Sequence, residues 1–193
     1  MMSLDIRGTN CVVGVRRHQT ELEMLIPRNF LLYLANIELA KFQSRQRRGQ
    51  VPSILRQPNP HYNEDEADAR GYLPIDAVLL GISEIISERT NLSPEGASRL
   101  VERNWEAIFN LVESWEDQSQ GYEWISITFE NYHSSIASGD FPMLAKLVAS
   151  ELGADHGDEL QSVCLIRVAE YMAKTVDRAK ELRIRLQPTE KSN

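Results

Sequence analysis

The stretch LSPEGASRLVER (residues 92–103) holds the side chains best suited to contact nucleic acid. Ser93 followed by proline predicts a helix start, because a serine oxygen caps free amides and a first-turn proline has no hydrogen bond to lose. Ser98 and Arg99 follow within the first turns, where they could hydrogen-bond a phosphate or a guanine edge. Arg103 lies one turn further along. These residue types predict hydrogen bonding to DNA rather than catalysis.

Catalytic and metal-binding chemistry has weaker candidates. His156, in the segment ADHGDE, has three carboxylates nearby that could bind a cation. These acids follow Gly153 at the expected start of a helix, where the helix dipole is sufficient reason for them. The sequence contains no glycine-rich phosphate loop, no paired metal ligands and no nucleophile motif. We therefore expect no enzyme activity, no metal and no cofactor.

Length and composition predict an ordinary globular protein. The chain has 193 residues, 42% of them hydrophobic and 25% charged, which suits one large domain or two small ones. Cys11 and Cys164 are far apart in apolar runs, as expected for buried thiols in a reducing compartment. No apolar run reaches the ~20 residues that cross a bilayer, and the N-terminus has no apolar signal core. We therefore expect a cytoplasmic protein with no membrane contact.

Charge is distributed unevenly along the chain. Residues 1–60 hold nine lysines and arginines against four acids, whereas residues 61–159 hold five against twenty. Residues 160–193 are again basic, with seven against four. This asymmetry indicates an interaction surface or attraction between parts of the chain.

Hydrophobic spacing predicts an all-α fold of about six helices. A first helix follows Pro27 and ends by Gly49. Its last turn carries the cations that a helix C-terminus favours, namely Arg45, Arg47 and Arg48. Prolines and then acids between Gln50 and Gly71 predict a linker. The expected domain organisation is an N-terminal arm and helix (1–49), the linker (50–71), a helical hairpin (72–121), a C-terminal helical part (122–186) and a disordered tail (187–193).

The segment 122–137 fits two patterns. Apolar and polar residues alternate in YEWISITF as in a strand, yet Trp124, Thr128, Tyr132 and Ile136 also form a helical stripe. The helix is favoured, because a strand would have no evident partner nearby. A short helix is expected over FPMLAKLVASEL, closed by Gly153, and a long one from about residue 158 to 186. The apolar side of this last helix predicts a dimer interface.

Residues 72–103 resemble the helix-turn-helix of bacterial and phage regulators. The Leu-Ser-Pro turn and the Ser-Arg-Leu helix carry the resemblance, and the opening YLPIDAVLL is loosely similar to the first helix of MerR-type domains. The resemblance implies a sequence-specific transcriptional regulator that binds duplex DNA. Its DNA-binding residues would be Ser93, Ser98, Arg99 and Arg103, with Arg45, Arg47 and Arg48 on phosphates.

Electrostatics keeps a second hypothesis open. DNA affinity depends on several lysine or arginine contacts, but the segment from Glu95 to Asp117 holds two arginines and six acids. DNA binding would therefore need the basic first helix or a second subunit. The alternative is an all-helical protein-interaction module, an adaptor, an inhibitor or a charge mimic of DNA, that presents its acidic middle to a basic partner. Trp105, Trp115 and Trp124 fit either core anchors or a partner-binding patch.

Overall fold

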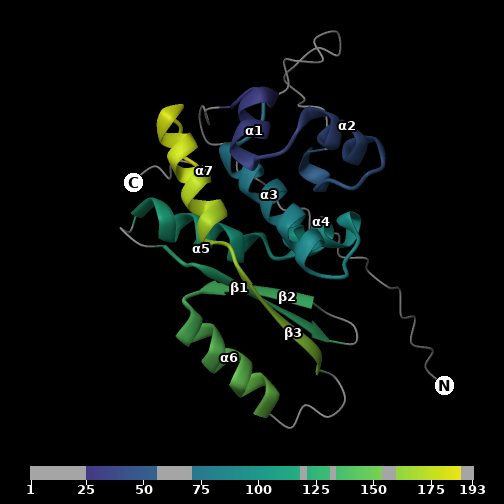
Figure 1. Ribbon diagram of the computed structural model, residues 1–193, viewed down its shortest axis with the longest axis vertical. Helices are drawn as coiled ribbons and strands as arrows, with labels where there is room; N and C mark the ends of the chain where they lie inside the picture. The colour runs from purple at the N-terminus through teal and green to yellow at the C-terminus, as the bar shows by residue number, and fades with distance from the viewer. Residues whose placement is uncertain (1–24, 56–70, 118–120, 131–133, 154–159, 188–193) are drawn as a thin grey trace, which may run out of the picture.

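The computed structural model describes residues 25–55, 71–117, 121–130, 134–153 and 160–187 (Figure 1). The N-terminal arm up to residue 24, most of the expected linker and the segment around His156 lie outside these ranges. The elements in chain order are α1 (Arg28–Ala35), α2 (Leu39–Arg47), the 3-10 turn η1 (Ser53–Leu55), α3 (Pro74–Arg89), α4 (Pro94–Arg103), α5 (Trp105–Asp117), β1 (Trp124–Glu130), β2 (Ser134–Gly139), α6 (Phe141–Gly153), β3 (Leu160–Arg167) and α7 (Ala169–Glu181).

The sheet lies between two unequal helical layers, as Figure 1 shows. One face is covered by the helical body, with α5 next to the sheet and α3 behind it, and the other face carries α6 alone. The centre of the body is α3, in which twelve of 16 residues are buried. Such a helix, apolar on nearly every side, is typical of a core position.

The sheet has the strand order β2-β1-β3, with antiparallel pairing on both sides of β1. Ile127 of β1 lies opposite Ile136 of β2 and Cys164 of β3. Directly opposite residues share a face of a sheet, and this face belongs to the main core. Ser126 and Thr128 point to the face under α6 and are also buried. Both faces of β1 are therefore covered.

The all-α prediction is wrong, because the described part of the chain has seven helices and a three-stranded antiparallel sheet. Residues 124–130 and 134–139 form a hairpin instead of the favoured helix. The partner that seemed to be missing is β3, about 30 residues further along the chain. In β3 the branched residues Val163 and Ile166 fit a pleated surface better than a helix.

The expected final helix is therefore a strand followed by a shorter helix, α7. The apolar residues between Leu160 and Leu182 do not lie along one helix, and Met172, Val176 and Ala179 of α7 are buried within their own chain. The dimer interface was predicted from one continuous apolar helix, and that helix does not form.

Two other expected helices are interrupted at asparagines. The first breaks at Asn36, which has a φ of 59°, a left-handed conformation that asparagine tolerates. The hairpin's second helix divides at Asn104, where α4 ends before α5 begins at Trp105. The short helix over 141–153 is confirmed as α6.

The packing of α7 against α3 predicts alkaline instability. The Tyr171 hydroxyl donates to the Ala77 carbonyl oxygen (3.1 Å), and burial raises the pKa of this phenol well above its usual range, against the opposing effects of Thr175 and Arg178. The folded chain therefore keeps a proton that the unfolded chain releases near pH 10. We expect the free energy of unfolding, measured in urea, to fall above about pH 10. Tyr171→Phe should show a smaller decline between pH 9 and about pH 11; an unchanged decline would contradict this role.

Candidate functional site

The helix-turn-helix-like hairpin forms at the expected place. α3 ends at Arg89, the turn covers residues 90–93, and α4 begins at Pro94. The Ser93 hydroxyl oxygen accepts a hydrogen bond from the Gly96 amide (3.1 Å), which confirms the predicted cap. Ser93 therefore has a structural role within α4.

Ser98 does not lie on the outer face of the hairpin. Its side chain is 0% exposed, and its hydroxyl donates to the Gln50 carbonyl oxygen (3.1 Å). The reason is the helical period: Ser98 lies between Ala97 and Leu100 on the side of α4 that faces the core. The prediction that Ser98 contacts DNA is therefore corrected.

The outer face of α4 carries both signs of charge. Arg99 is exposed and forms an ion pair with Glu95 (2.5 Å). Glu102 accepts a hydrogen bond from the Ser53 amide. Arg103 is exposed and has no ion-pair partner among the described residues. A duplex approaching this face would meet the carboxylates of Glu95 and Glu102 as well as the two guanidinium groups.

One of the three arginines expected to contact phosphates is engaged within the fold. Arg45 turns inward to the nearly buried carboxylate of Glu84 on α3 (2.9 Å), which also pairs with Lys41 (2.8 Å). Burial alone would lower the pKa of Lys41, but hydrogen bonds with Glu84 and Glu88 outweigh it and raise this pKa. Arg47 and Arg48 are exposed at the end of α2. Of the three arginines predicted to support DNA binding, Arg45 instead ties two helices together.

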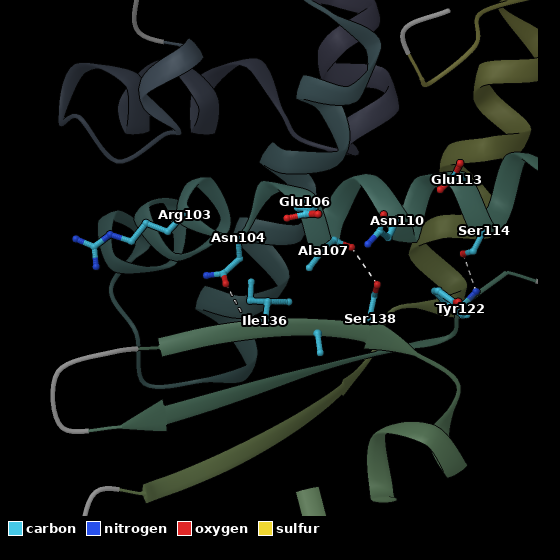
Figure 2. Close-up of a pocket in the computed structure, with 11 residues that line it drawn as sticks. Arg103, Asn104, Glu106, Ala107, Asn110, Glu113, Ser114, Tyr122, Ile136 and Ser138 are labelled. Atoms are coloured by element: carbon cyan, nitrogen blue, oxygen red, sulfur yellow. Dashed lines mark hydrogen bonds between the residues drawn. The ribbon is translucent and has the colours of Figure 1, made fainter. Parts of the chain in front are cut away.

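A groove with a largely polar lining lies between α5 and β2 (Figure 2). Its volume is about 690 Å³. Figure 2 shows residues of α5 along one side and Ile136 and Ser138 of β2 along the other. The groove begins near Arg103 and Asn104 and ends at Ser114 and Tyr122, where the Tyr122 amide donates to the Ser114 hydroxyl oxygen (2.9 Å). We call this feature the α5–β2 groove.

The α5 side of the groove is acidic. Glu106, Asn110 and Glu113 follow one another at intervals of four and three residues, so they share one side of the helix. Apolar residues such as Ile108 and Leu111 occupy the opposite side and are fully buried. Both glutamates are exposed, and neither has an ion-pair partner among the described residues. The groove therefore offers two carboxylates that form no ion pair, with Arg103 as the one cation among the described residues that line it.

The β2 side of the groove is the edge of the sheet. The side-chain amide of Asn104 bonds the edge of β2 as the backbone of a neighbouring strand would. Its Oδ1 accepts a hydrogen bond from the Ile136 amide (3.1 Å), and its Nδ2 donates one to the Ser134 carbonyl oxygen (3.4 Å). The Ser138 hydroxyl donates to the Ala107 carbonyl oxygen (3.0 Å), which ties β2 to α5. These contacts hold the strand edge at a fixed place beside the acidic helix.

A second groove lies between α1 and α7, but its polar groups bind one another. Arg178 donates to the Tyr33 carbonyl oxygen and to Asn36 Oδ1, both at 2.9 Å, and its guanidinium lies 4.9 Å from the centre of the Tyr33 ring. The Tyr33 hydroxyl donates to Glu181 (2.8 Å), and this bond is the main cause of a raised Tyr33 pKa. This groove offers a ligand fewer free polar groups than the α5–β2 groove does.

Metal and membrane chemistry gain no support within the described ranges. No group of three histidine, cysteine, aspartate or glutamate side chains there could hold a metal ion. None of the helices in those ranges combines the length and the apolar character that a membrane span requires. His156 and Cys11 fall outside these ranges, and Cys164 is a half-buried free thiol.

Comparison of the sequence with known proteins found no relative. No protein-family model matches the sequence, and no curated protein is a significant match to it. The site must therefore be interpreted from its own geometry.

Sequence reasoning missed the groove. The sequence does contain a signal for the acidic side of α5, because Glu106, Asn110 and Glu113 recur at helical spacing opposite the apolar residues. Asn104 and Ser138 had no comparable signal, since their roles depend on a hairpin that packs beside α5.

Proposed function

We propose that this chain is a protein-interaction module that binds a basic segment of a partner protein in the α5–β2 groove. The observation that carries the proposal is the pair of exposed carboxylates, Glu106 and Glu113, which form no ion pair among the described residues and outnumber Arg103, the one cation that lines the groove. Unpaired charge along a groove favours a ligand of opposite charge and speeds its encounter. The acidic excess of residues 61–159 adds to the same attraction.

The competing hypothesis, a regulator that reads duplex DNA, has less support. Ser98 is buried, Arg99 pairs with Glu95, and Arg45 pairs with Glu84. Arg47, Arg48 and Arg103 remain exposed, which is fewer than the six to ten phosphate contacts typical of strongly salt-dependent DNA binders. An adaptor or inhibitor, which we propose to be cytoplasmic, accords better with these contacts.

Neutralising the groove should weaken binding of a cationic probe. For a short peptide of alternating lysine and threonine residues, we expect the double variant Glu106→Gln, Glu113→Gln to bind about five- to tenfold more weakly, because two exposed ion pairs are each worth roughly 0.5–0.7 kcal/mol. Isothermal titration calorimetry at about 150 mM salt measures the change.

A matched double variant controls for total charge. Glu95→Gln with Glu170→Gln removes the same two charges from exposed positions outside the groove, and it should leave the affinity nearly unchanged. Equal losses in both double variants would reject the groove as the site. Tight binding of random duplex DNA at the same salt concentration, lost on Arg99→Ala, would favour the regulator hypothesis instead.

A further inference from the structure

The unpaired edge of β2 has backbone groups directed into the α5–β2 groove. In an antiparallel ladder, the amide and carbonyl of one residue point to the same side, and the side alternates from residue to residue. The Ile136 amide bonds Asn104 on the side away from β1, so the Ile136 carbonyl also points away from β1. By the same alternation, the amide and carbonyl of Ser138 face away from β1. Ile136 and Ser138 both line the groove.

We propose that the partner segment binds in the groove as an extended strand that adds to the edge of β2. Asn104 already supplies the first rung, at Ile136 and Ser134, and the partner backbone continues the ladder along Ile136 and Ser138. Exposed strand edges are templates for such pairing, and peptide recognition by strand addition takes its affinity from main-chain hydrogen bonds. This inference rests on the proposed function and names how the same groove holds its ligand.

The acidic helix beside the edge selects the side chains of the strand. Glu106 and Glu113 are seven residues apart, so they lie about 10 Å apart along the helix axis. An extended chain covers this distance in roughly three residues. Lysine or arginine residues two or four positions apart on one face of the added strand would therefore reach both carboxylates, because their side chains are long and flexible.

Backbone N-methylation of the probe tests strand addition. Two versions of the lysine–threonine peptide are needed, one methylated at the lysine amides and the other at the threonine amides. Only one set of amides can face β2 while the lysines face α5. We expect one version to lose about tenfold in affinity through two lost hydrogen bonds, to the carbonyl oxygens of Ile136 and Ser138, while the other binds like the parent peptide.

The outcomes separate the two proposals. If the two methylated peptides bind alike, whether tightly or weakly, strand addition is wrong. If they do so while the Glu106→Gln, Glu113→Gln variant still binds the parent peptide more weakly, the proposed function stands without the strand. If the parent peptide does not bind the wild-type chain at all, both proposals fail.

Discussion

Replacing Glu84 by alanine is expected to lower the free energy of unfolding by about 3–5 kcal/mol. The Glu84 side chain is 9% exposed and pairs with Arg45, whose own side chain is 16% exposed. Removal of the carboxylate leaves a nearly buried guanidinium without its counter-ion, and one of its nitrogens, Nη1, already lacks a hydrogen-bond partner. The loss is large because an unpaired buried charge keeps its full desolvation cost. Urea unfolding followed by circular dichroism measures it.

Glu88 provides the control for this prediction. It also pairs with Lys41 (3.1 Å), but its side chain is 61% exposed. Glu88→Ala should therefore change stability by less than about 1 kcal/mol. Similar losses for Glu84→Ala and Glu88→Ala would mean that Arg45 is not held by Glu84 in the interior.

Replacing Gly81 by alanine is expected to destabilise the chain by about 2–3 kcal/mol. Gly81 lies in the middle of α3, where a side chain is normally preferred, because glycine weakens a helix by about 1 kcal/mol. A methyl group at this position would overlap the Tyr171 hydroxyl and ring, so α7 would have to move away from α3. The overpacking cost exceeds the gain in helix propensity. Thermal or urea unfolding gives the difference.

Gly96 of α4 is the matched position. A methyl group there would lie 3.3 Å from Ser93 Oγ and 3.8 Å from the nearest carbon of Leu92, with no ring in its way. Gly96→Ala should change stability by less than about 1 kcal/mol in either direction. If Gly81→Ala proved equally mild, close packing of α7 on α3 would be disproved.

Capping residues and apolar spacing within short segments predicted several of the helices. Ser93 and Pro94 located the start of α4, and the glycine at 153 marked the end of α6. Ile82, Ile86 and their neighbours recur at helical spacing, as the helical hairpin expected over 72–121 requires, but this spacing does not show that α3 is the centre of the core. These features depend on residues within a few positions of one another.

The sheet could not be predicted in the same way. β1 pairs with β3 across some 30 intervening residues. When the partner of a strand is that distant, the pattern of apolar residues in the segment itself does not distinguish the strand from a helix. The buried position of Ser98 follows from the chain around Gln50, which folds onto α4 from a distant part of the sequence. Site residues chosen from one hairpin therefore missed the groove, because its two sides come from separate elements.

The placement of Asn104 connects the fold with the proposed function. The asparagine ends α4, lets α5 start in a new direction and bonds the edge of β2. The same junction that breaks the expected long helix therefore creates the groove. A chain with an unbroken helix from Pro94 to Asp117 would have no such contact with the sheet.

The most direct test of the account is a chemical-shift titration of the isotope-labelled chain with the lysine–threonine peptide. The account predicts saturable shifts of the backbone amides of Glu106, Glu113 and Ser138, and small changes at Arg47 and Arg99. Shifts concentrated on the outer faces of α2 and α4, or spread evenly over all acidic positions, would contradict the claim that the α5–β2 groove is the binding site.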